Sequence, residues 1–298
     1  MSDYSRALVT GGAGFIGSHL IDALLGRGLE VISLDNYVAG RSENLNLARR
    51  SENFTELRRD VVGLDPVLLR DVDVVFHLAA SKKAISMRDP RLDLLTNIIG
   101  TFDLLTAAKL MQVKCFIHAS TGSVYGEVEG EITEASPLNP VSVYGVSKLA
   151  GEKYVQGFHS LYKLPATILR YFHVYGPRQN DQDHIGGVVA TFKRRLELGL
   201  PLTVHGDGEQ VRSFTHVTDV VKANLFCLDH PETIGLVSNV ASGVRVTINQ
   251  LVTELEKASG KKAIVEHAEP LPGDIRNFNI GPLALEKYGF NIKGGFNV

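Results

Sequence analysis

The chain has 298 residues, of which 44% are hydrophobic and 21% are charged, with a formal net charge of -2. This composition is typical of a folded globular protein and excludes a disordered or fibrous chain. The charge gives no electrostatic reason to expect nucleic acid, and no apolar run approaches the ~18 residues needed to span a bilayer. Because Met1–Arg6 does not resemble a secretory leader, we expect a cytoplasmic protein without a nucleic-acid or membrane partner.

Short apolar segments alternate with longer segments of helical period in the first half of the chain, which predicts parallel strands joined by crossover helices. The two most distinct helices are predicted over residues 89–111 and 141–162, each with an apolar stripe. The predicted strands lie within Arg6–Gly12, Leu29–Asn36, Asp71–Ala80, Lys114–Ser120 and Ala166–Gly176.

The pattern changes after Pro177, where a polar loop over residues 178–187 precedes a helical stretch that ends near Leu198. The alternation of strands and helices becomes irregular from there on. We therefore predict an α/β Rossmann fold, with a doubly wound parallel sheet and a smaller C-terminal substrate-binding lobe.

Both cysteines, Cys115 and Cys227, occur in apolar segments, which predicts buried free thiols rather than a disulfide. Cysteines and histidines are not clustered, so the sequence predicts no metal site.

A glycine triplet, Gly11, Gly14 and Gly17, follows the first strand and opens a helix. This order places free backbone N–H groups and the positive helix end where a dinucleotide pyrophosphate would lie. Asp35 closes the second predicted strand, where a carboxylate accepts both ribose hydroxyls and repels a 2′-phosphate. The pattern favours NAD over NADP. Arg41, in the next loop, is either a solvated charge or a partner for a 2′-phosphate.

Tyr144 and Lys148 lie four residues apart on a predicted helix, so their side chains share one face. A tyrosine with its usual pKa of about 10 is a poor base at neutral pH. An adjacent ammonium and a nicotinamide cation would favour the phenolate, which predicts that Tyr144 acts as a general base.

Together these motifs resemble the extended short-chain dehydrogenase/reductase family, specifically its NAD-dependent nucleotide-sugar epimerases and dehydratases, with UDP-glucose 4-epimerase-like members foremost. The other resembling segments are LDNYVAGRSENL, RRDV, HLAA, NIIGT, STGSVYG, LRYFHVYGPR, GDGEQVRSFTHVTDV and PGDIR. The resemblance covers nearly the whole chain. It implies an enzyme with NAD as cofactor, a nucleotide-diphosphate sugar as substrate, and a homodimer formed through the two long helices.

The resemblance also implies a division into domains and a set of site residues. Residues 1–170 with 209–242 would form the NAD-binding Rossmann domain, and residues 171–208 with 243–298 the nucleotide-sugar-binding lobe. The implied catalytic residues are Thr121, Tyr144 and Lys148. The implied cofactor-binding residues are Gly11, Gly14, Phe15, Ile16, Gly17, Asp35, Asn36, Asp60, Val61, Leu78, Ala79, Ala80, Asn97, Tyr144 and Lys148. The implied substrate-binding residues are Lys82, Thr121, Ser123, Tyr144, His173, Arg212 and Arg276.

The implied reaction begins when the Tyr144 phenolate takes a proton from a sugar hydroxyl while hydride passes to NAD, giving a 4-keto sugar and enzyme-bound NADH. Return of the hydride to the other face gives 4-epimerisation. Family 4,6-dehydratases follow the catalytic Thr with an Asp and a Glu, where this chain has Gly122 and Ser123. We therefore expect a 4-epimerase, with a dehydratase as the alternative and a non-catalytic NAD and nucleotide sensor as a minor one.

Two departures from the family pattern leave the substrate open. His173 stands where many relatives have an Asn that contacts the substrate phosphate. Lys82 and Lys83 lie on a loop that approaches the sugar in relatives, and they are either solvated charges or ligands for an acidic sugar. A third possibility is that one of them assists a 5,6-dehydration together with Glu127.

Overall fold

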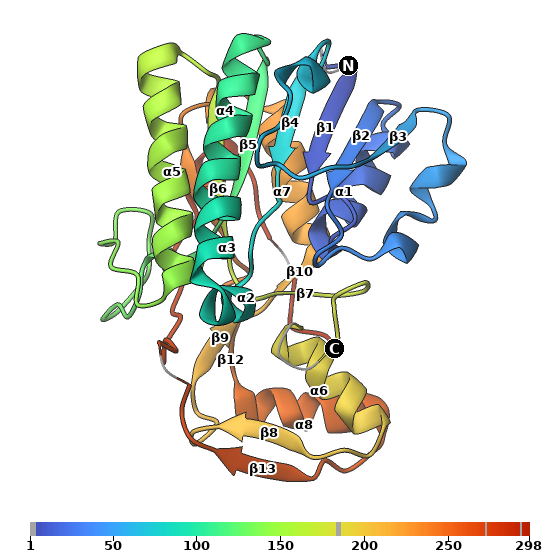
Figure 1. Cartoon of the computed structure of the whole chain (residues 1–298). Coiled ribbons are helices and arrows are strands. Elements are labelled where there is room, and N and C mark those ends of the chain that lie inside the picture. Colours follow the sequence, from blue (N-terminus) through green and yellow to red (C-terminus); the bar gives the residue numbers. More distant parts are fainter. Residues whose placement is uncertain (1–3, 183–185, 272, 293) are drawn as a thin grey trace.

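The computed structural model describes residues 4–298 except 183–185, 272 and 293 (Figure 1). Within these residues, a seven-stranded parallel sheet has the order β3-β2-β1-β4-β5-β6-β11. Its strands are β1 (Arg6–Thr10), β2 (Glu30–Asp35), β3 (Phe54–Arg58), β4 (Val74–His77), β5 (Cys115–Thr121), β6 (Ala166–Tyr171) and β11 (Val237–Val240). This order reverses between β1 and β4, as in a Rossmann fold, and confirms the predicted fold class.

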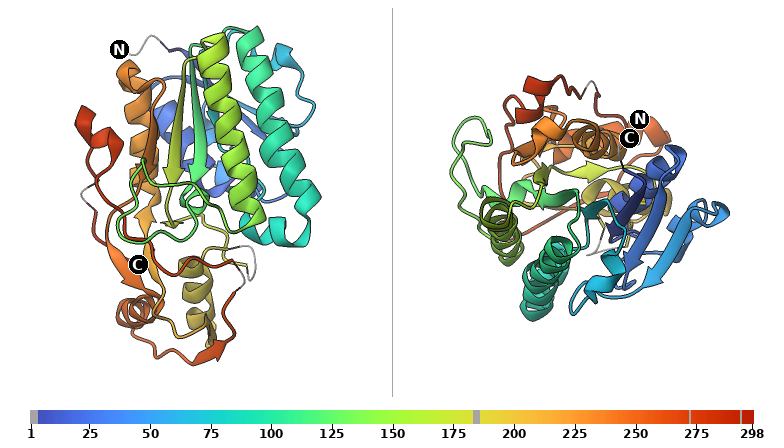
Figure 2. Two further views of the ribbon diagram at one scale, coloured as in Figure 1. Left: turned by 90° about the vertical axis from the view of Figure 1, so that its left-hand side faces the viewer. Right: turned by 90° about the horizontal axis from the view of Figure 1, so that it is seen from above.

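Helices cover both faces of the sheet (Figure 2). Those around the sheet are α1 (Phe15–Gly26), α2 (Lys83–Arg88), α3 (Pro90–Leu94), α4 (Thr101–Leu110), α5 (Val143–Tyr162) and α7 (Val217–Asp229). The side chains of β1 alternate between two apolar cores. Ala7 and Val9 pack with α1 and α7, and Leu8 packs with α4 and α5. The central strands are therefore apolar at nearly every position, as a doubly covered sheet requires.

The five predicted strand segments correspond to β1, β2, β4, β5 and β6, with β5 ending one residue later than predicted, at Thr121. Strands β3 and β11 were not predicted. The edge strand β3 has mostly exposed side chains, and β11 contains the polar residues Ser238 and Asn239. The predicted helix over 89–111 consists of α3, a π-helical segment (Leu95–Gly100) and α4.

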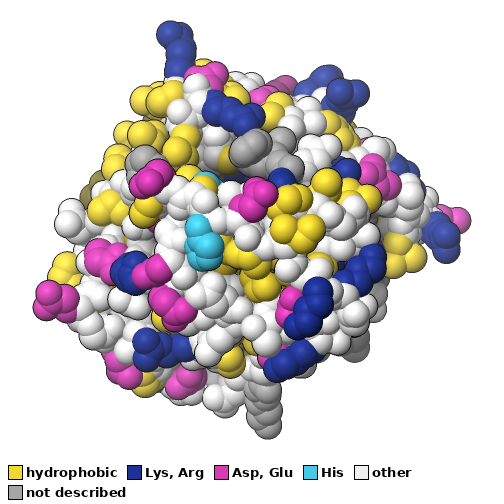
Figure 3. Space-filling view, turned by 90° about the horizontal axis from the view of Figure 1, so that it is seen from below, with side chains coloured by type: hydrophobic (Ala, Val, Ile, Leu, Met, Phe, Trp, Pro, Cys, Tyr) yellow, Lys and Arg dark blue, Asp and Glu magenta, His cyan; other side chains and the backbone are white. Residues whose placement is uncertain are grey.

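A smaller lobe lies beyond the carboxyl ends of the strands (Figure 1). Its elements are α6 (Val188–Glu197), β8 (Leu202–His205), β9 (Val211–Ser213), β12 (Arg245–Thr247), α8 (Ile248–Ser259) and β13 (Val265–Ala268). Phe192, Leu202 and Leu251 belong to its separate apolar core. Acidic and basic side chains are interspersed over the face of the lobe in Figure 3.

Between the sheet and the lobe, β7 (Val174–Tyr175) pairs with β10 (Thr215–His216). The domain division remains a prediction, but β9 lies in the segment 209–242 and pairs with β12 in the segment 243–298. Part of the predicted loop over 178–187, namely residues 183–185, lies outside the described residues.

Cys115 and Cys227 are free and buried, which confirms the prediction for both thiols. Among the described residues, no helix is both long and apolar enough to cross a membrane.

Candidate active site

The turn between β1 and α1 is built for close approach of a ligand. Gly11 has a φ of +68°, and a Cβ on it would lie 2.8 Å from the backbone nitrogen of Ala79. A Cβ on Gly17 would lie 2.2 Å from the Gly11 carbonyl oxygen, so neither position tolerates a side chain. Gly14 caps α1 without a side-chain hydrogen bond, which leaves the first amides of the helix to a ligand.

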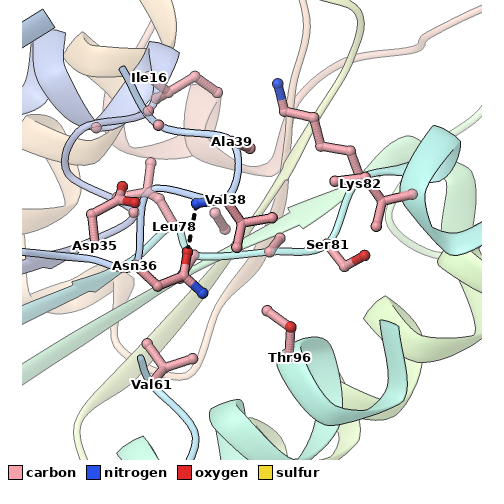
Figure 4. Close-up of a pocket in the computed structure, with 18 of the residues that line it drawn as sticks. Ile16, Asp35, Asn36, Val38, Ala39, Val61, Leu78, Ser81, Lys82 and Thr96 are labelled. Carbon is pink, nitrogen blue, oxygen red and sulfur yellow. Dashed lines mark hydrogen bonds between the residues drawn. The ribbon is translucent and has the colours of Figure 1, made fainter. Parts of the chain in front are cut away.

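This turn opens into a cleft of about 1190 Å³, including its mouth, at the carboxyl ends of the strands (Figure 4). Fourteen of the fifteen predicted cofactor residues line it, and only Asn97 does not. The predicted residues in the lining are Gly11, Gly14, Phe15, Ile16, Gly17, Asp35, Asn36, Asp60, Val61, Leu78, Ala79, Ala80, Tyr144 and Lys148. The glycine cradle, the helix end and the apolar walls therefore suit a dinucleotide.

Asp35 ends β2 at the cleft and is only 7% exposed. Its carboxylate accepts hydrogen bonds from the backbone N–H groups of Ala13 (3.0 Å) and Tyr37 (2.7 Å). Burial raises the pKa of Asp35, and these two amides oppose that rise. The amides also fix the carboxylate at the strand end, where a ribose would be bound.

Asn36 and Asp60 lie beside each other on this wall of the cleft. The Asn36 amide donates to the Asp60 carboxylate at 2.7 Å. The Asn36 side-chain oxygen accepts from the Val38 amide at 3.0 Å, which holds the loop after β2 in place (Figure 4).

Asn97 lies behind the cleft wall, in the π-helical segment, and is 1% exposed. Its side chain accepts from the Ser81 amide (2.8 Å) and donates to the Ser81 carbonyl (3.1 Å). It also donates to the Ser147 hydroxyl on α5 at 3.0 Å. Asn97 therefore links the loop after β4 to the helix that carries Tyr144 and Lys148. Local unwinding into a π-helix is common at functional sites.

Two of the three predicted catalytic residues line one end of the cleft, and the third, Thr121, does not line it but lies beside Tyr144. Tyr144 and Lys148 both line it from the first turns of α5, which begins after the N-cap Ser142. Thr121 ends β5 and makes a side-chain hydrogen bond with Tyr144. The Thr121 hydroxyl also accepts from the Ser123 amide at 3.2 Å.

The protonation of the Tyr144 and Lys148 pair differs from the sequence-based expectation. Burial raises the pKa of Tyr144 to about 12, and the hydrogen bond with Thr121 opposes the rise. Burial lowers the pKa of Lys148 to about 8, and the carboxylates of Glu152 and Asp93 oppose that fall. For both side chains, desolvation by burial thus shifts the pKa more than the neighbouring charged and polar groups of the protein do. A nicotinamide cation in the cleft would therefore be needed to favour the Tyr144 phenolate.

Lys82 and Lys83 have separate roles. Lys82 lines the cleft and extends across it toward Ile16 (Figure 4). Burial and the nearby Arg41 lower the pKa of Lys82. Lys83 instead donates to the Gly273 carbonyl at 3.1 Å and lies 3.9 Å from the Asp274 carboxylate. Lys83 therefore joins α2 to the C-terminal part of the chain.

His173 is held in a left-handed conformation, with a φ of +36°, between the cleft and the lobe. Its ring packs edge-on against Phe278 and Phe214, at centroid distances of 4.5 and 6.0 Å. It also lines a small apolar cavity next to the N-terminus of α6. Burial first, and then the nearby Arg212, keep the pKa of His173 well below its usual value, so the imidazole is neutral.

The two predicted phosphate ligands are paired with carboxylates. Arg212 donates to Asp274 at 2.6 Å and is 8% exposed. Arg276 donates to Asp207 at 2.6 Å, and its side chain is 59% exposed. Glu127 accepts from the backbone N–H of Arg276 at 2.8 Å. Lys82 or Lys83 was suggested to assist a 5,6-dehydration with Glu127, but Lys83 and Glu127 bond to different partners.

A buried polar network that was not predicted lies behind the site. Glu152 and Arg170 form an ion pair whose side chains are 0% and 3% exposed. Two buried histidines, His77 and His118, lie on the same side of the sheet. The sequence does contain a sign of this ion pair. Arg170 lies in the otherwise apolar strand segment ATILRYF, and a buried arginine requires a partner.

A Rossmann sheet, an uncapped helix after a glycine turn, and a Tyr–Lys pair in the same cleft define a dinucleotide-dependent enzyme. The chain belongs to the NAD dependent epimerase/dehydratase family, whose model matches residues 7–241. It is therefore an NAD-dependent enzyme.

Similar proteins include several 4-epimerases. A UDP-glucose 4-epimerase of Mycolicibacterium smegmatis is 39% identical, over 91% of this chain and 88% of its own length. The structure of a UDP-glucuronic acid 4-epimerase from Bacillus cereus, with UDP-glucuronic acid and NAD, aligns with a TM-score of 0.88 and 35% identity over 93% of this chain and 90% of that one. The structure of a UDP-glucose 4-epimerase from Thermotoga maritima, with UDP-glucose, aligns with a TM-score of 0.89 and 37% sequence identity. The alignment covers 97% of this chain and 94% of that one.

Proposed function

We propose that this protein is a UDP-sugar 4-epimerase that uses NAD. The observation that carries the proposal is the composition of the catalytic end of the cleft. Tyr144 and Lys148 line it, and Thr121 is hydrogen-bonded to Tyr144. Gly122 and Ser123, in contrast, offer no carboxyl group for removal of water. The relatives named above are UDP-sugar 4-epimerases, which supports the choice of nucleotide and reaction.

Position 122 also has no space for an acid. A Cβ on Gly122 would lie 2.3 Å from the Phe172 ring, which is 1% exposed and fixed in the core. An aspartate at this position would displace that ring. The packing therefore supports epimerisation over 4,6-dehydration.

The residues of the cleft supply the proton transfers. The Tyr144 oxygen takes the proton of the sugar C4 hydroxyl, and Thr121 holds that hydroxyl through its own. NAD held in this cleft by the glycine turn and Asp35 would supply the hydride transfer to and from C4, and return of the hydride to the opposite face of the sugar would invert that carbon. Tyr144 then gives the proton back to the C4 oxygen, so atoms and electrons balance and only the configuration at C4 changes.

The remaining predicted residues are assigned to binding. Lys82 crosses the cleft above the glycine turn, which suits a pyrophosphate group. Arg212 and Arg276 would bind the diphosphate of the UDP-sugar, each exchanging its carboxylate partner for a phosphate. The neutral His173 donates one hydrogen bond in place of the family's Asn.

We further propose a homodimer. Helices α3, α4 and α5 lie side by side in Figure 1. Their outer faces and the π-helical segment between α3 and α4 carry large apolar side chains that are between 37% and 74% exposed: Leu94, Ile99, Phe102, Val143, Val146, Tyr154, Leu161 and Tyr162. An apolar surface of this extent is typical of an interface. An isologous helix pair from each protomer would cover it.

The function is tested by incubating the purified protein with a panel of UDP-sugars and identifying the products by mass and NMR. An epimerase gives a product of unchanged mass with inverted C4, and Tyr144→Phe gives none while it still binds NAD. A product lighter by one water would instead establish a dehydratase. No conversion of any UDP-sugar would refute the proposal.

A further inference from the structure

One carboxylate, that of Glu152, links several elements behind the active site. It accepts two hydrogen bonds from the Arg170 guanidinium, at 2.9 and 2.7 Å, and one from the Ser120 hydroxyl. Arg170 also donates to the Tyr125 hydroxyl at 2.7 Å, and Tyr125 donates to Asn239 at 2.7 Å. The network therefore ties α5 to β5, β6 and β11.

Each end of this network adjoins a catalytic residue. Glu152 lies one helical turn after Lys148, on the face of α5 that packs on the sheet. Ser120 directly precedes Thr121 on β5. A shift of the Glu152 carboxylate would therefore move the helix with Tyr144 relative to the strand with Thr121.

Stability alone does not explain a buried ion pair. Desolvation of the Glu152 carboxylate and the Arg170 guanidinium offsets most of their attraction, so an apolar pair of similar size is often at least as stable. The pair does, however, have bidentate geometry, which fixes position and orientation. This geometry suggests that the pair aligns α5 with strands β5 and β6.

The charges around Lys148 come from four elements. Glu152 on α5 and Asp93 on α3 are the carboxylates that oppose the burial-induced fall in its pKa. His77 on β4 and His118 on β5 also face Lys148, but burial holds the pKa of each imidazole far below its usual value, so both are neutral. Glu152 is thus one of two anions among the described residues that favour the Lys148 ammonium.

We propose that Glu152 is a positioning residue of the active site. It holds the helix of Tyr144 and Lys148 against the strand of Thr121, and it supplies an anion that keeps Lys148 charged beside Tyr144. Arg170 and Ser120 fix the carboxylate in that place. This role rests on the proposed function only in naming Tyr144 as the base.

The test is a titration of the Lys148 ammonium, followed through the NMR shift of its side-chain Cε in protein labelled with carbon-13 lysine, with Lys148→Met to assign the signal. The variants are Glu152→Gln, the neutral double variant Glu152→Gln/Arg170→Met, and the control Val155→Ala. Val155 is 1% exposed on the same helix, so its truncation loosens packing without changing charge. The double variant avoids an unpaired buried guanidinium, which could prevent Glu152→Gln from folding.

Removal of Glu152 takes away one of the two carboxylates that oppose the effect of burial on the pKa of Lys148. Lys148 then loses its proton at lower pH, while Asp93 remains in every variant. We expect the midpoint of Lys148 to fall by about one pH unit in both Glu152 variants. Val155→Ala should keep the wild-type midpoint while its melting temperature falls.

A double variant with the wild-type Lys148 midpoint would overturn the proposal. An equal fall in Val155→Ala would also overturn it, because it would show that loosening of the helix suffices. The titration needs no sugar, so it separates the two hypotheses. A lowered midpoint in a protein that epimerises no UDP-sugar supports the role of Glu152 and refutes only the proposed function.

Discussion

The Arg41 guanidinium lies 2.9 Å from the Asp181 carboxylate and joins the loop after β2 to the segment that follows β7. The same segment contacts α1 twice. His19 is hydrogen-bonded to the Pro177 carbonyl at 2.9 Å, and Arg178 lies 2.7 Å from Asp22. The loop after β2 and the start of α1 both line the cofactor cleft. Ion pairs and a hydrogen bond thus connect residues 177–181 to the elements that would hold NAD.

Asp181→Asn should speed the dissociation of NAD, because it removes the ion pair with Arg41 while keeping the size of the side chain. Both side chains are about one-third exposed, so we expect a rise of only about two- to fivefold. The measurement is the loss of bound NAD during rapid gel filtration or dilution. Asp229→Asn is the matched control, since Asp229 pairs with Arg27 at the other end of α1. Equal rates in the two variants would contradict a role in retention.

Asp35→Asn should weaken NAD binding by about tenfold or more, the range for loss of a charge-assisted hydrogen bond. It should also reduce the discrimination against NADP, because a carboxylate repels a 2′-phosphate. Arg41 is engaged by Asp181, so we expect the double variant Asp35→Asn/Asp181→Asn to bind NADP better than Asp35→Asn does. Calorimetric titration with NAD and with NADP measures the affinity of each variant for both dinucleotides. An unchanged preference in both variants would show that the ribose is recognised elsewhere.

The sequence predicted most of the cofactor cleft because the signals for this part of the molecule are local. The glycine turn, the end of β2 and the Tyr144–Lys148 spacing each lie within a few residues, and the sheet brings them into one cleft. The Glu152–Arg170 pair and the contacts of Arg41 with Asp181 join distant segments. Such contacts depend on tertiary packing, and the sequence showed only that a charge in a buried strand needed a partner.

Lys148→Met should abolish turnover and stabilise the fold. Burial lowers the pKa of Lys148 from 10.5 to about 8, so the folded state disfavours the ammonium that the unfolded chain carries. The unfolded state therefore binds more protons between these values, and this lysine costs stability that is regained as pH rises through that window. We expect a gain of up to about 3 kcal/mol at neutral pH, which shrinks between pH 8 and 10.5.

Urea unfolding of the wild type and Lys148→Met across this pH range measures the effect. A variant that is less stable at neutral pH would show that Asp93 and Glu152 fully compensate the burial of the ammonium. That result would make Lys148 a structural as well as a catalytic residue.

Phe102→Lys should convert the proposed dimer to a monomer. Phe102 is 41% exposed on α4, and its ring packs edge-on against Tyr154 of α5 at 5.6 Å. The substitution places a charge in the middle of the apolar surface, where association would bury it without a partner. Leu198→Lys is the control, since Leu198 follows α6 on the lobe and is 61% exposed. Light scattering coupled to size exclusion should give a monomer for Phe102→Lys alone. A monomeric wild type, or a dimeric Phe102→Lys, would mean that this surface is not the interface.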